Sequence, residues 1–358
     1  MKVTDACAKR LPAISVILPT FNGEKRLPVA LRSLREQDVD QSLVEIVVVD
    51  DDSSDGTVTV ARAFGARVVR NGAKDPERGK AIGIKAASND IIMFIDDDHV
   101  LPSRDWLRSA LSCFISFPDA VGAQPARFEY ERHESAANRY VGMFGANDPV
   151  AFYLRRRDRL MVTEAGWRLA GTVVAETVNC WLVELSEHNF PPVGAQGFIT
   201  RKSTVERTLW WPLYFHIDTN LQLTRQGANQ FVMLKSSIIH RHSDTVSDFL
   251  AKLRRNMNQF LHVKSQRSYT WARSNFSIAV AGIKMLTLAI PLVDSFKCFI
   301  KTGDRAAFLH VYFSFIVPFM YAGQAVSFVA KGEASADRLR RRLQAEGGSG
   351  ENSLHPKA

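Results

Sequence analysis

Two runs of three aspartates are the residues in this chain best suited to chemistry. Asp50–Asp52 follow the apolar stretch Val44–Val49, and Asp96–Asp98 follow the apolar stretch Ile91–Ile95. Several carboxylates at one place are costly unless a cation or a proton compensates their charge. Because hard divalent cations prefer oxygen ligands, the two runs predict a Mg²⁺ or Mn²⁺ site.

The segments around these aspartates alternate between strand and helix patterns. Predicted strands cover Ala13–Leu18, Val44–Val49, Ala66–Val69, Ile91–Ile95 and, later, Phe231–Ile239. Predicted helices cover Lys25–Gln37, Thr57–Phe64 and Lys80–Ala87. This alternation is typical of an α/β fold with a mostly parallel sheet and right-handed crossovers. Ligands of such sheets bind at the carboxyl ends of the strands, where both aspartate runs lie.

The chain of 358 residues has a formal net charge of +9. A basic balance suits nucleic acid, an anionic membrane surface or phosphorylated ligands. The positive charge concentrates in Lys252–Arg273 and Lys331–Arg342, on either side of the most apolar part of the chain. That distribution favours a membrane and argues against a nucleic-acid partner.

The cysteines and the N-terminus indicate a reducing compartment. The four cysteines are scattered and form no CxxC pair, so we expect neither a disulfide framework nor a zinc site. The first residues lack the long apolar core of a signal peptide. The main domain is therefore expected in the cytoplasm.

The most apolar part of the chain predicts a membrane-associated helical hairpin. Phe308–Val329 contains no Lys, Arg, Asp or Glu and meets the roughly 20 residues that a spanning helix needs. Phe276–Val293 is a weaker candidate because Lys284 interrupts it, and Asp294–Ala307 would link the two. The positive-inside rule then places both ends, and the catalytic domain, on the cytoplasmic side of the cell membrane.

Two alternatives to spanning stay open. The segments could be buried helices of a soluble domain. They could also form an interfacial or re-entrant hairpin, because Pro291 and Pro318 interrupt them. Asp248–Arg273 reads as a basic amphipathic helix that lies on an anionic bilayer, with a plain surface helix as the alternative.

These patterns divide the chain into five parts. The predicted parts are an N-terminal extension (1–12), an α/β catalytic domain (13–245), a basic amphipathic helix region (246–274), a membrane-associated helical hairpin (275–332) and a basic, then disordered, tail (333–358).

The ordered motifs of the first two thirds resemble glycosyltransferase family 2. The resemblance covers roughly residues 12–245 and rests on Ile14–Gly23 (ISVILPTFNG), on DDDSSDGT from Asp50, on FIDDDHVLP from Phe94 and on Asp218. It implies a GT-A fold, a nucleotide-sugar donor, a divalent metal and inversion at the anomeric carbon.

The resemblance assigns the first motifs to the nucleoside. Pro19, Thr20 and Phe21 would line the base pocket, and Asp51 would accept a hydrogen bond from an imide N–H of the base. A carboxylate only accepts, which favours uracil, thymine or guanine. The alternative for Asp50–Asp52 is an acidic turn or helix cap.

Between the runs, the family often has an arginine that contacts the nucleotide. Lys80 stands near that position, with Arg78 close by, and either could touch the diphosphate. Lysine lacks the bidentate geometry of arginine. Solvated surface charge is the alternative.

The second aspartate run matches the family's DxD motif. Asp98 is the expected metal ligand, Asp96 would reach the ribose or the metal, and Asp97 is assigned to the nucleotide. His242, or alternatively His240, is a further candidate ligand. Structural histidines or polar loop residues are the other interpretation.

The acceptor half of the site is assigned to later residues. Asp218 takes the second position of the family's acidic pair, with Ile217 in the first, and would be the general base. A helix N-cap is the alternative for Asp218. Gly197 would line the acceptor side, and Trp210 and Trp211 could stack on a sugar or pack in the core.

The resulting hypothesis is a membrane-associated inverting glycosyltransferase of glycan or cell-envelope polysaccharide synthesis. Its donor would be a nucleotide-diphosphate sugar. Its acceptor would be a hydroxyl or a phosphate group, carried by a lipid-linked intermediate or a glycan. A sugar-phosphate nucleotidyltransferase is the alternative enzyme. A non-catalytic, membrane-tethered nucleotide-sugar binding protein is the alternative outside catalysis.

Overall fold

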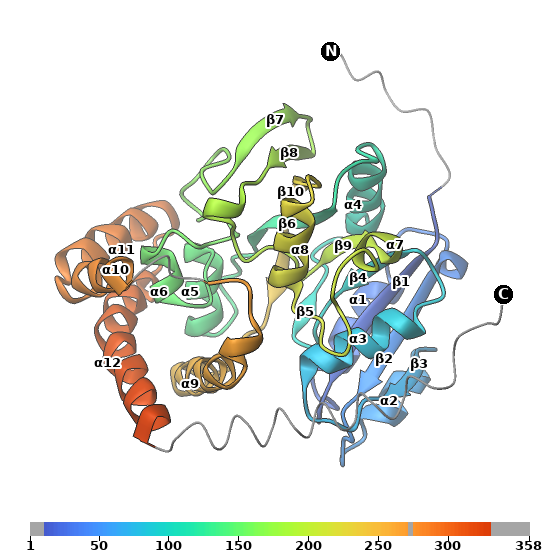
Figure 1. Cartoon of the computed structure of the whole chain (residues 1–358), viewed down its shortest axis with the longest axis horizontal. Helices are drawn as coiled ribbons and strands as arrows, with labels where there is room; N and C mark the ends of the chain where they lie inside the picture. The colour runs from blue at the N-terminus through green and yellow to red at the C-terminus, as the bar shows by residue number, and fades with distance from the viewer. Residues whose placement is uncertain (1–10, 271–274, 331–358) are drawn as a thin grey trace. The chain divides into compact units, whose positions relative to one another are not determined.

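The computed structural model describes residues 11–270 and 275–330. These divide into two compact units (Figure 1). The first holds residues 11–134, 138–147 and 155–242, and the second holds residues 135–137, 148–154, 243–270 and 275–330. The predicted disordered tail and most of the predicted N-terminal extension lie outside the described residues. The predicted domain limits stay predictions.

One sheet organises the first unit, with the strand order β3-β2-β1-β4-β9-β6-β10-β8-β7. β5 lies off this path and pairs with β10. The strands are β1 (Ile14–Thr20), β2 (Val44–Asp50), β3 (Arg67–Arg70), β4 (Ile91–Phe94), β5 (His99–Val100), β6 (Gly122–Phe128), β7 (Thr172–Glu176), β8 (Cys180–Glu184), β9 (Phe198–Arg201) and β10 (Gln230–His240).

The predicted α/β class is confirmed, and the parallel order holds for one half of the sheet. β3, β2, β1 and β4 run parallel, and the inner strands β1 and β4 are buried on both faces. The other half is mixed. β9 runs antiparallel between β4 and β6, and β10 is parallel to β6 but antiparallel to β8 and β5.

The first unit also contains helices, several of which pack against this sheet. They are α1 (Leu27–Arg35), α2 (Thr57–Ala63), α3 (Pro76–Ala86), α4 (Trp106–Ile115), α5 (Ala136–Phe144), α7 (Lys202–Val205) and α8 (His216–Arg225). α3 begins four residues earlier than predicted because the Asp75 side chain accepts the amides of Glu77 and Arg78 and caps it. At Gly83 a Cβ would lie 2.3 Å from Ile17, so glycine lets α3 approach β1 closely.

The second unit is helical. It consists of α6 (Pro149–Tyr153), α9 (Val246–Val263), α10 (Asn275–Leu286), α11 (Ala289–Thr302), α12 (Leu309–Ala330) and a short 3₁₀ turn at Arg305–Phe308. Side-chain hydrogen bonds connect α12 to α6 and to Asp148, the N-cap residue of α6. The Tyr153 hydroxyl lies 2.7 Å from His310 Nε2, and the Tyr321 hydroxyl donates to Asp148 over 2.8 Å.

The predicted hairpin differs from the observed helices. Phe276–Val293 is not one segment, because the chain breaks at Leu288 (φ 56°) and α10 and α11 meet at 67°. Pro291 explains the break, since its ring would clash with the carbonyl four residues earlier. α11 then continues to Thr302, through most of the predicted link.

α12 matches the stronger predicted segment. The stretch Arg305–Val329 is long and apolar enough to cross a membrane, with a mean hydropathy of 1.5. Pro318 lies inside α12 without ending it. The α10–α11 pair would meet the same criterion only as one bent span.

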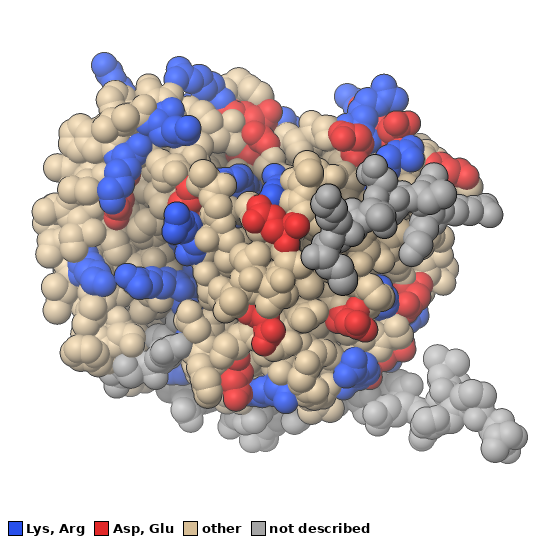
Figure 2. Space-filling model, turned by 90° about the horizontal axis from the view of Figure 1, so that it is seen from above, with Lys and Arg blue, Asp and Glu red and all other residues tan. Residues whose placement is uncertain are grey.

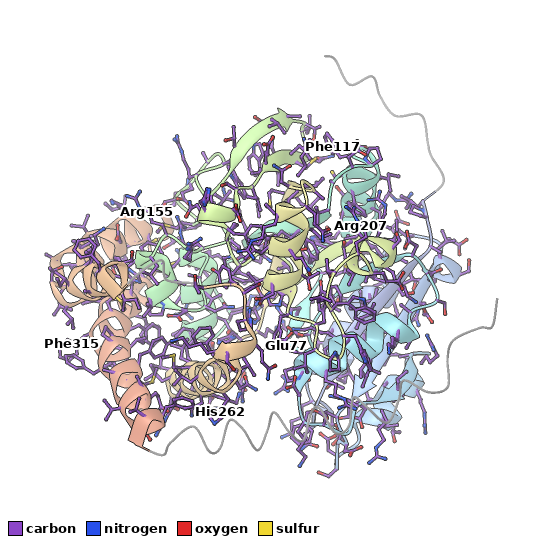
Figure 3. The ribbon with its side chains drawn as sticks, viewed as in Figure 1. Glu77, Phe117, Arg155, Arg207, His262 and Phe315 are labelled. Carbon is purple, nitrogen blue, oxygen red and sulfur yellow. The ribbon has the colours of Figure 1, made fainter. Side chains whose placement is uncertain are left out.

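The predicted amphipathic helix is shorter than expected and ends at Val263. Its apolar side chains pack on α12. Phe249 stacks on Phe313 at 4.5 Å between ring centroids, and His262 meets Phe328 edge-on at 5.3 Å. Figure 3 labels His262 on this helix and Phe315 on α12. α12 thus covers part of the apolar face of the helix, and its location on a bilayer stays a prediction.

Candidate active site

The two aspartate runs meet at the carboxyl edge of the parallel strands, as predicted. β1 lies between β2 and β4. Its last residue, Thr20, is in register with Asp50 of β2. The Thr20 hydroxyl donates over 2.7 Å to Asp97, which follows β4. One residue therefore connects the ends of both strands.

Asp98, His240 and His242 form a compact cluster beside this edge. Their candidate ligand atoms all lie within 4.8 Å of one another. His240 Nε2 lies 3.7 Å from an Asp98 carboxylate oxygen and 3.4 Å from His242 Nδ1. One carboxylate oxygen and two imidazole nitrogens are donors that suit a divalent transition metal such as Mn²⁺. The arrangement therefore fits a metal-binding role.

His99 belongs to the same cluster, and the sequence analysis missed it. β5 pairs antiparallel with β10, which sets His99 opposite His240, and the rings stack at 4.3 Å. His99 Nδ1 accepts the Asp96 amide and lies 3.2 Å from an Asp98 oxygen. Burial, together with the neighbouring His240, lowers the pKa of His99 to about 4. The available signal was its position directly after the second run.

Asp97 is engaged within the protein. Both of its oxygens lie 3.2 Å from nitrogens of the Arg26 guanidinium, and one also accepts from Thr20. Burial raises the pKa of the Asp97 carboxyl, although these hydrogen bonds counteract the rise. The arrangement makes Asp97 a tether between β1, the start of α1 and the second run. Its predicted contact with the nucleotide stays a prediction.

Asp51 and Phe21 meet at the loop that precedes α3. The amide of Lys74 donates to Asp51 over 2.6 Å, and the Lys74 ammonium lies 5.6 Å from the centre of the Phe21 ring. Burial raises the pKa of Asp51. The Phe21 side chain is 45% exposed, so part of its ring is accessible to solvent near this carboxylate.

Pro19 and Lys80 are both buried below this loop. A Cβ at Gly79 would lie 3.2 Å from Pro19, so the Pro19 ring packs closely against the first turns of α3. Lys80 Nζ lies 3.3 Å from Glu77, labelled at the start of α3 in Figure 3. Burial alone would lower the pKa of Lys80, but Glu77, Asp96 and Asp75 outweigh it and raise the pKa.

Arg78 and Lys80 differ in their exposure to solvent. Arg78 lies in the first turn of α3 and is half-buried, whereas Lys80 is 7% exposed. The surface-charge alternative therefore does not hold for Lys80. The roles of both residues toward a diphosphate stay predictions.

Asp218 lies in the first turn of α8, whose N-cap is Phe215. The N-cap alternative for Asp218 is therefore wrong. A negative side chain in the first turn is favoured by the helix dipole. Asp218 is half-buried.

The loop 193–197 connects the start of α8 to the end of β4. Asn220 of α8 donates to the Val193 carbonyl over 3.1 Å, and the Gly197 amide donates to the Phe94 carbonyl over 2.8 Å. Gly194 has φ 122°, and a Cβ there would lie 2.3 Å from Asn220. The loop thus links the helix of Asp218 to the strand that carries the second aspartate run.

The two tryptophans lie elsewhere. The Lys85 ammonium is 3.2 Å from the centre of the Trp211 ring, and Trp210 packs edge-on against Trp211 at 6.0 Å. Lys85 belongs to the last turn of α3, whereas the aspartate runs lie near the first turn of that helix. The predicted contact of Trp210 and Trp211 with an acceptor stays a prediction.

Residues 15–166 match the model of a family described as Glycosyl transferase family 2. A 4,4'-diaponeurosporenoate glycosyltransferase from Staphylococcus haemolyticus is 33% identical over 146 residues, 38% of this chain and 38% of that protein. A GalNAc(5)-diNAcBac-PP-undecaprenol beta-1,3-glucosyltransferase from Campylobacter jejuni is 36% identical over 100 residues, 26% of this chain and 32% of that protein. The chain thus spans less than half the length of these relatives.

A solved structure resembles the chain over most of its length. It is a mannosyltransferase from Pyrobaculum calidifontis, in complex with GDP-Man and Mn²⁺. The TM-score is 0.55 at 14% identity, covering 90% of this chain and 88% of that one. At this identity the likeness concerns the fold alone, and it confirms the predicted GT-A fold.

Proposed function

Residues 15–166 belong to glycosyl transferase family 2, and from this premise we propose that the protein is an inverting glycosyltransferase. It moves a sugar from a nucleotide-diphosphate sugar to an acceptor hydroxyl. The observation that carries the proposal is the Asp98–His240–His242 cluster at the carboxyl edge of β1, β2 and β4. This is the edge at which parallel sheets bind ligands.

The nucleoside would lie over the first aspartate run. Phe21 offers an exposed ring for a base to stack on, and Asp51 offers a carboxylate whose position is held by the Lys74 amide. An acceptor-only group selects a base with an imide N–H. The donor is therefore proposed to carry uracil, thymine or guanine.

The diphosphate would lie against the second run. Asp98, His240 and His242 would hold a divalent cation, and their mixed oxygen and nitrogen donors favour Mn²⁺ over Mg²⁺. Such a cation offsets the charge that develops on the departing nucleoside diphosphate. Lys80, buried beside Asp96, adds a fixed positive charge on the same side.

The acceptor would be activated from α8. Asp218 accepts the proton of the attacking hydroxyl as the new glycosidic bond forms, which is work for a carboxylate within hydrogen-bond reach. Attack on the face opposite the leaving group inverts the anomeric carbon. The loop 193–197 supports this division, because it joins the helix of Asp218 to the end of β4.

A membrane partner is supported by the surface of the second unit. Its helices expose large apolar side chains, which soluble monomers rarely gather in one area. These are Phe276, Ile283, Val293, Ile300, Phe315, Phe319, Val326 and Val329. Residues 243–330 carry ten Lys and Arg and four Asp, a net charge of 10 − 4 = +6. Lys and Arg side chains stand among uncharged residues in the left part of Figure 2, which holds this unit.

The acceptor is therefore proposed to be lipid-linked, with the first unit on the cytoplasmic side. The relative from Campylobacter jejuni, whose name includes an undecaprenol-linked compound, points in the same direction. Flotation of the purified chain with phosphatidylglycerol vesicles tests the membrane partner. Binding that Ile300→Glu and Phe319→Glu weaken is expected, and no flotation would contradict the proposal.

The enzymatic proposal is tested by donor turnover. The purified chain is incubated with UDP-, GDP- and dTDP-sugars and Mn²⁺, and release of nucleoside diphosphate is measured. We expect slow release from one class of donor. Asp218→Asn should lower it by about 10²–10⁴-fold, while binding of the nucleoside diphosphate persists.

Asp248→Asn is the matched control, because Asp248 also lies in the first turn of a helix. Unchanged turnover in Asp218→Asn would remove Asp218 from the mechanism. Pyrophosphate release from a nucleoside triphosphate and a sugar phosphate would favour the nucleotidyltransferase. Donor binding without any turnover would favour the non-catalytic alternative.

A further inference from the structure

Arg159 is a fully buried cation that takes no part in the chemistry above. Its side chain is 0% exposed, and it pairs with the neighbouring Asp158. A buried guanidinium is costly unless hydrogen bonds engage its donors. The partners of the remaining donors therefore indicate what the residue does.

Those partners lie in the loop 193–197. Arg159 Nη2 donates to the carbonyls of Ala195 over 3.2 Å and Gln196 over 3.3 Å. Gln196 has φ 58°, a left-handed conformation that costs free energy in a residue with a side chain. Such a path persists only when surrounding groups hold it, and the planar guanidinium supplies two of the contacts.

The same loop is held at its other residues as well. The Gly194 amide donates to Gln124 over 3.2 Å, and Gln124 Nε2 donates to the Asp158 carbonyl over 3.3 Å. At its two ends the loop contacts Asn220 of α8 and the carbonyl of Phe94 at the end of β4. Arg159, Asp158 and Gln124 thus form one buried polar group beneath the loop.

Arg159 also contacts the ring next to the histidine cluster. Its guanidinium carbon lies 5.3 Å from the centre of the Phe128 ring, and that ring lies 5.2 Å from the ring of His240. Arg159 therefore contacts both Phe128, whose ring packs on His240, and the loop 193–197, which contacts α8.

We propose that Arg159 is a positioning residue, which fixes the loop 193–197 and the start of α8 relative to the Asp98–His240–His242 cluster. The catalytic part of this statement rests on the proposed function, because it needs Asp218 to act as the base. The structural part does not. Lysine at this position keeps the charge but has a single nitrogen, so it cannot engage Asp158 and both loop carbonyls in the planar arrangement of the guanidinium, which uses Nη1 for Asp158 and Nη2 for the carbonyls.

The test compares Arg159→Lys with Arg127→Lys. Arg127 is the matched control, because it also donates to two loop carbonyls, those of Met161 and Glu164, but not to 193–197. Amide hydrogen exchange followed by mass spectrometry is measured on both variants. Faster exchange confined to 193–197 and 216–220 is expected in Arg159→Lys and not in the control.

Kinetics separate positioning from a structural role. For the donor class that the wild type turns over, Arg159→Lys should lower kcat per folded molecule at least about tenfold, with the donor KM and the Mn²⁺ affinity within about twofold of wild type. That split is expected when the base moves and the donor site stays. A structural role alone would lower the yield of folded protein and leave kcat per folded molecule unchanged.

Two outcomes would overturn the inference. One is wild-type exchange in 193–197; the other is faster exchange there with kcat unchanged. If the wild type turns over no donor, the proposed function fails, and hydrogen exchange still decides the structural part. If Arg159→Lys does not fold, Gln124→Met takes its place: it removes the acceptor for the Gly194 amide and should give the same pattern at smaller size.

Discussion

After β2, the carboxylates of the first run hold the loops around them. Asp50 accepts the amide of Ser53 over 3.1 Å, and Asp51 accepts the amide of Lys74. Asp52 makes a bidentate pair with Arg70 at 2.5 and 2.9 Å. All of these partners lie within a short stretch of the chain, and they are amides or a guanidinium.

After β4, the second run faces partners from both ends of the first unit as well as the next residue in the chain. Asp97 is tied to Thr20 and Arg26, whereas Asp98 lies beside His99 and His240. Neutral imidazole nitrogens can bind a metal together with a carboxylate, but amides and guanidinium groups cannot. The comparison teaches that three identical residues acquire different chemistry from what the fold brings to them.

Asp98→Asn is expected to have the largest effect, because it removes a proposed metal ligand from the second aspartate run. Removing the carboxylate that lies beside His99, His240 and His242 should abolish Mn²⁺ binding and lower donor turnover by about 10³-fold, because a catalytic metal contributes several kcal/mol of charge stabilisation. Electron paramagnetic resonance of free Mn²⁺ measures the binding. Asp52→Asn is the matched control from the first run, and equal losses in both variants would erase the distinction.

His99→Phe sharpens the contrast within the second run. Phenylalanine keeps a ring against His240 but removes the nitrogen beside Asp98 and the acceptor for the Asp96 amide. Loss of a group that orients metal ligands typically weakens metal affinity by about 10–100-fold. Calorimetric titration with Mn²⁺ checks this, and wild-type affinity would show that His99 has no part in the site.

The smallest expected effect is on the pH dependence of folding stability, to which the neighbouring carboxyls Asp51 and Asp52 contribute. Arg70 lowers the pKa of Asp52, so Asp52 stabilises the fold above its unfolded pKa and loses this contribution as the pH falls. Burial raises the pKa of Asp51, so the fold loses stability as the pH rises from 3.8 through the folded pKa.

The variants Asp52→Asn and Asp51→Asn should therefore differ in opposite directions between pH 3 and pH 7. The Tm advantage of wild type over Asp52→Asn should grow as the pH rises, and its advantage over Asp51→Asn should shrink. Thermal unfolding in EDTA-containing buffers measures both. Parallel trends in the two variants would contradict the opposite pKa shifts.

The sequence predicted the parallel half of the fold well. β1, β2 and β4 are short β-branched or apolar runs, and their positions differ from the predicted ones by at most two residues. Local patterns suffice there because the inner strands are buried on both faces. The metal role of Asp98 and the base role of Asp218 were read from motifs and remain predictions.

The mixed half was not predictable from local patterns. β9 comes between β4 and β6 although it follows both in the chain, and β7 and β8 form an edge hairpin. The position of His99 depends on the pairing of β5 with β10, which no single segment encodes. The bend at Leu288 was suggested by Pro291, whereas the continuity of α12 through Pro318 was not.

The pairing of β5 with β10 has a consequence for how the protein is made. Its contacts join residues 99–100 to residues 239–240, and the Arg241 amide closes the arrangement on the Asp98 carbonyl. A chain emerging from the ribosome presents Asp98 long before His240 and His242. Because contacts so distant in sequence form late, a nascent chain that ends before residue 242 has no complete cluster. A cation that binds only to the complete cluster would then stabilise the folded state in which β10 is paired with β5.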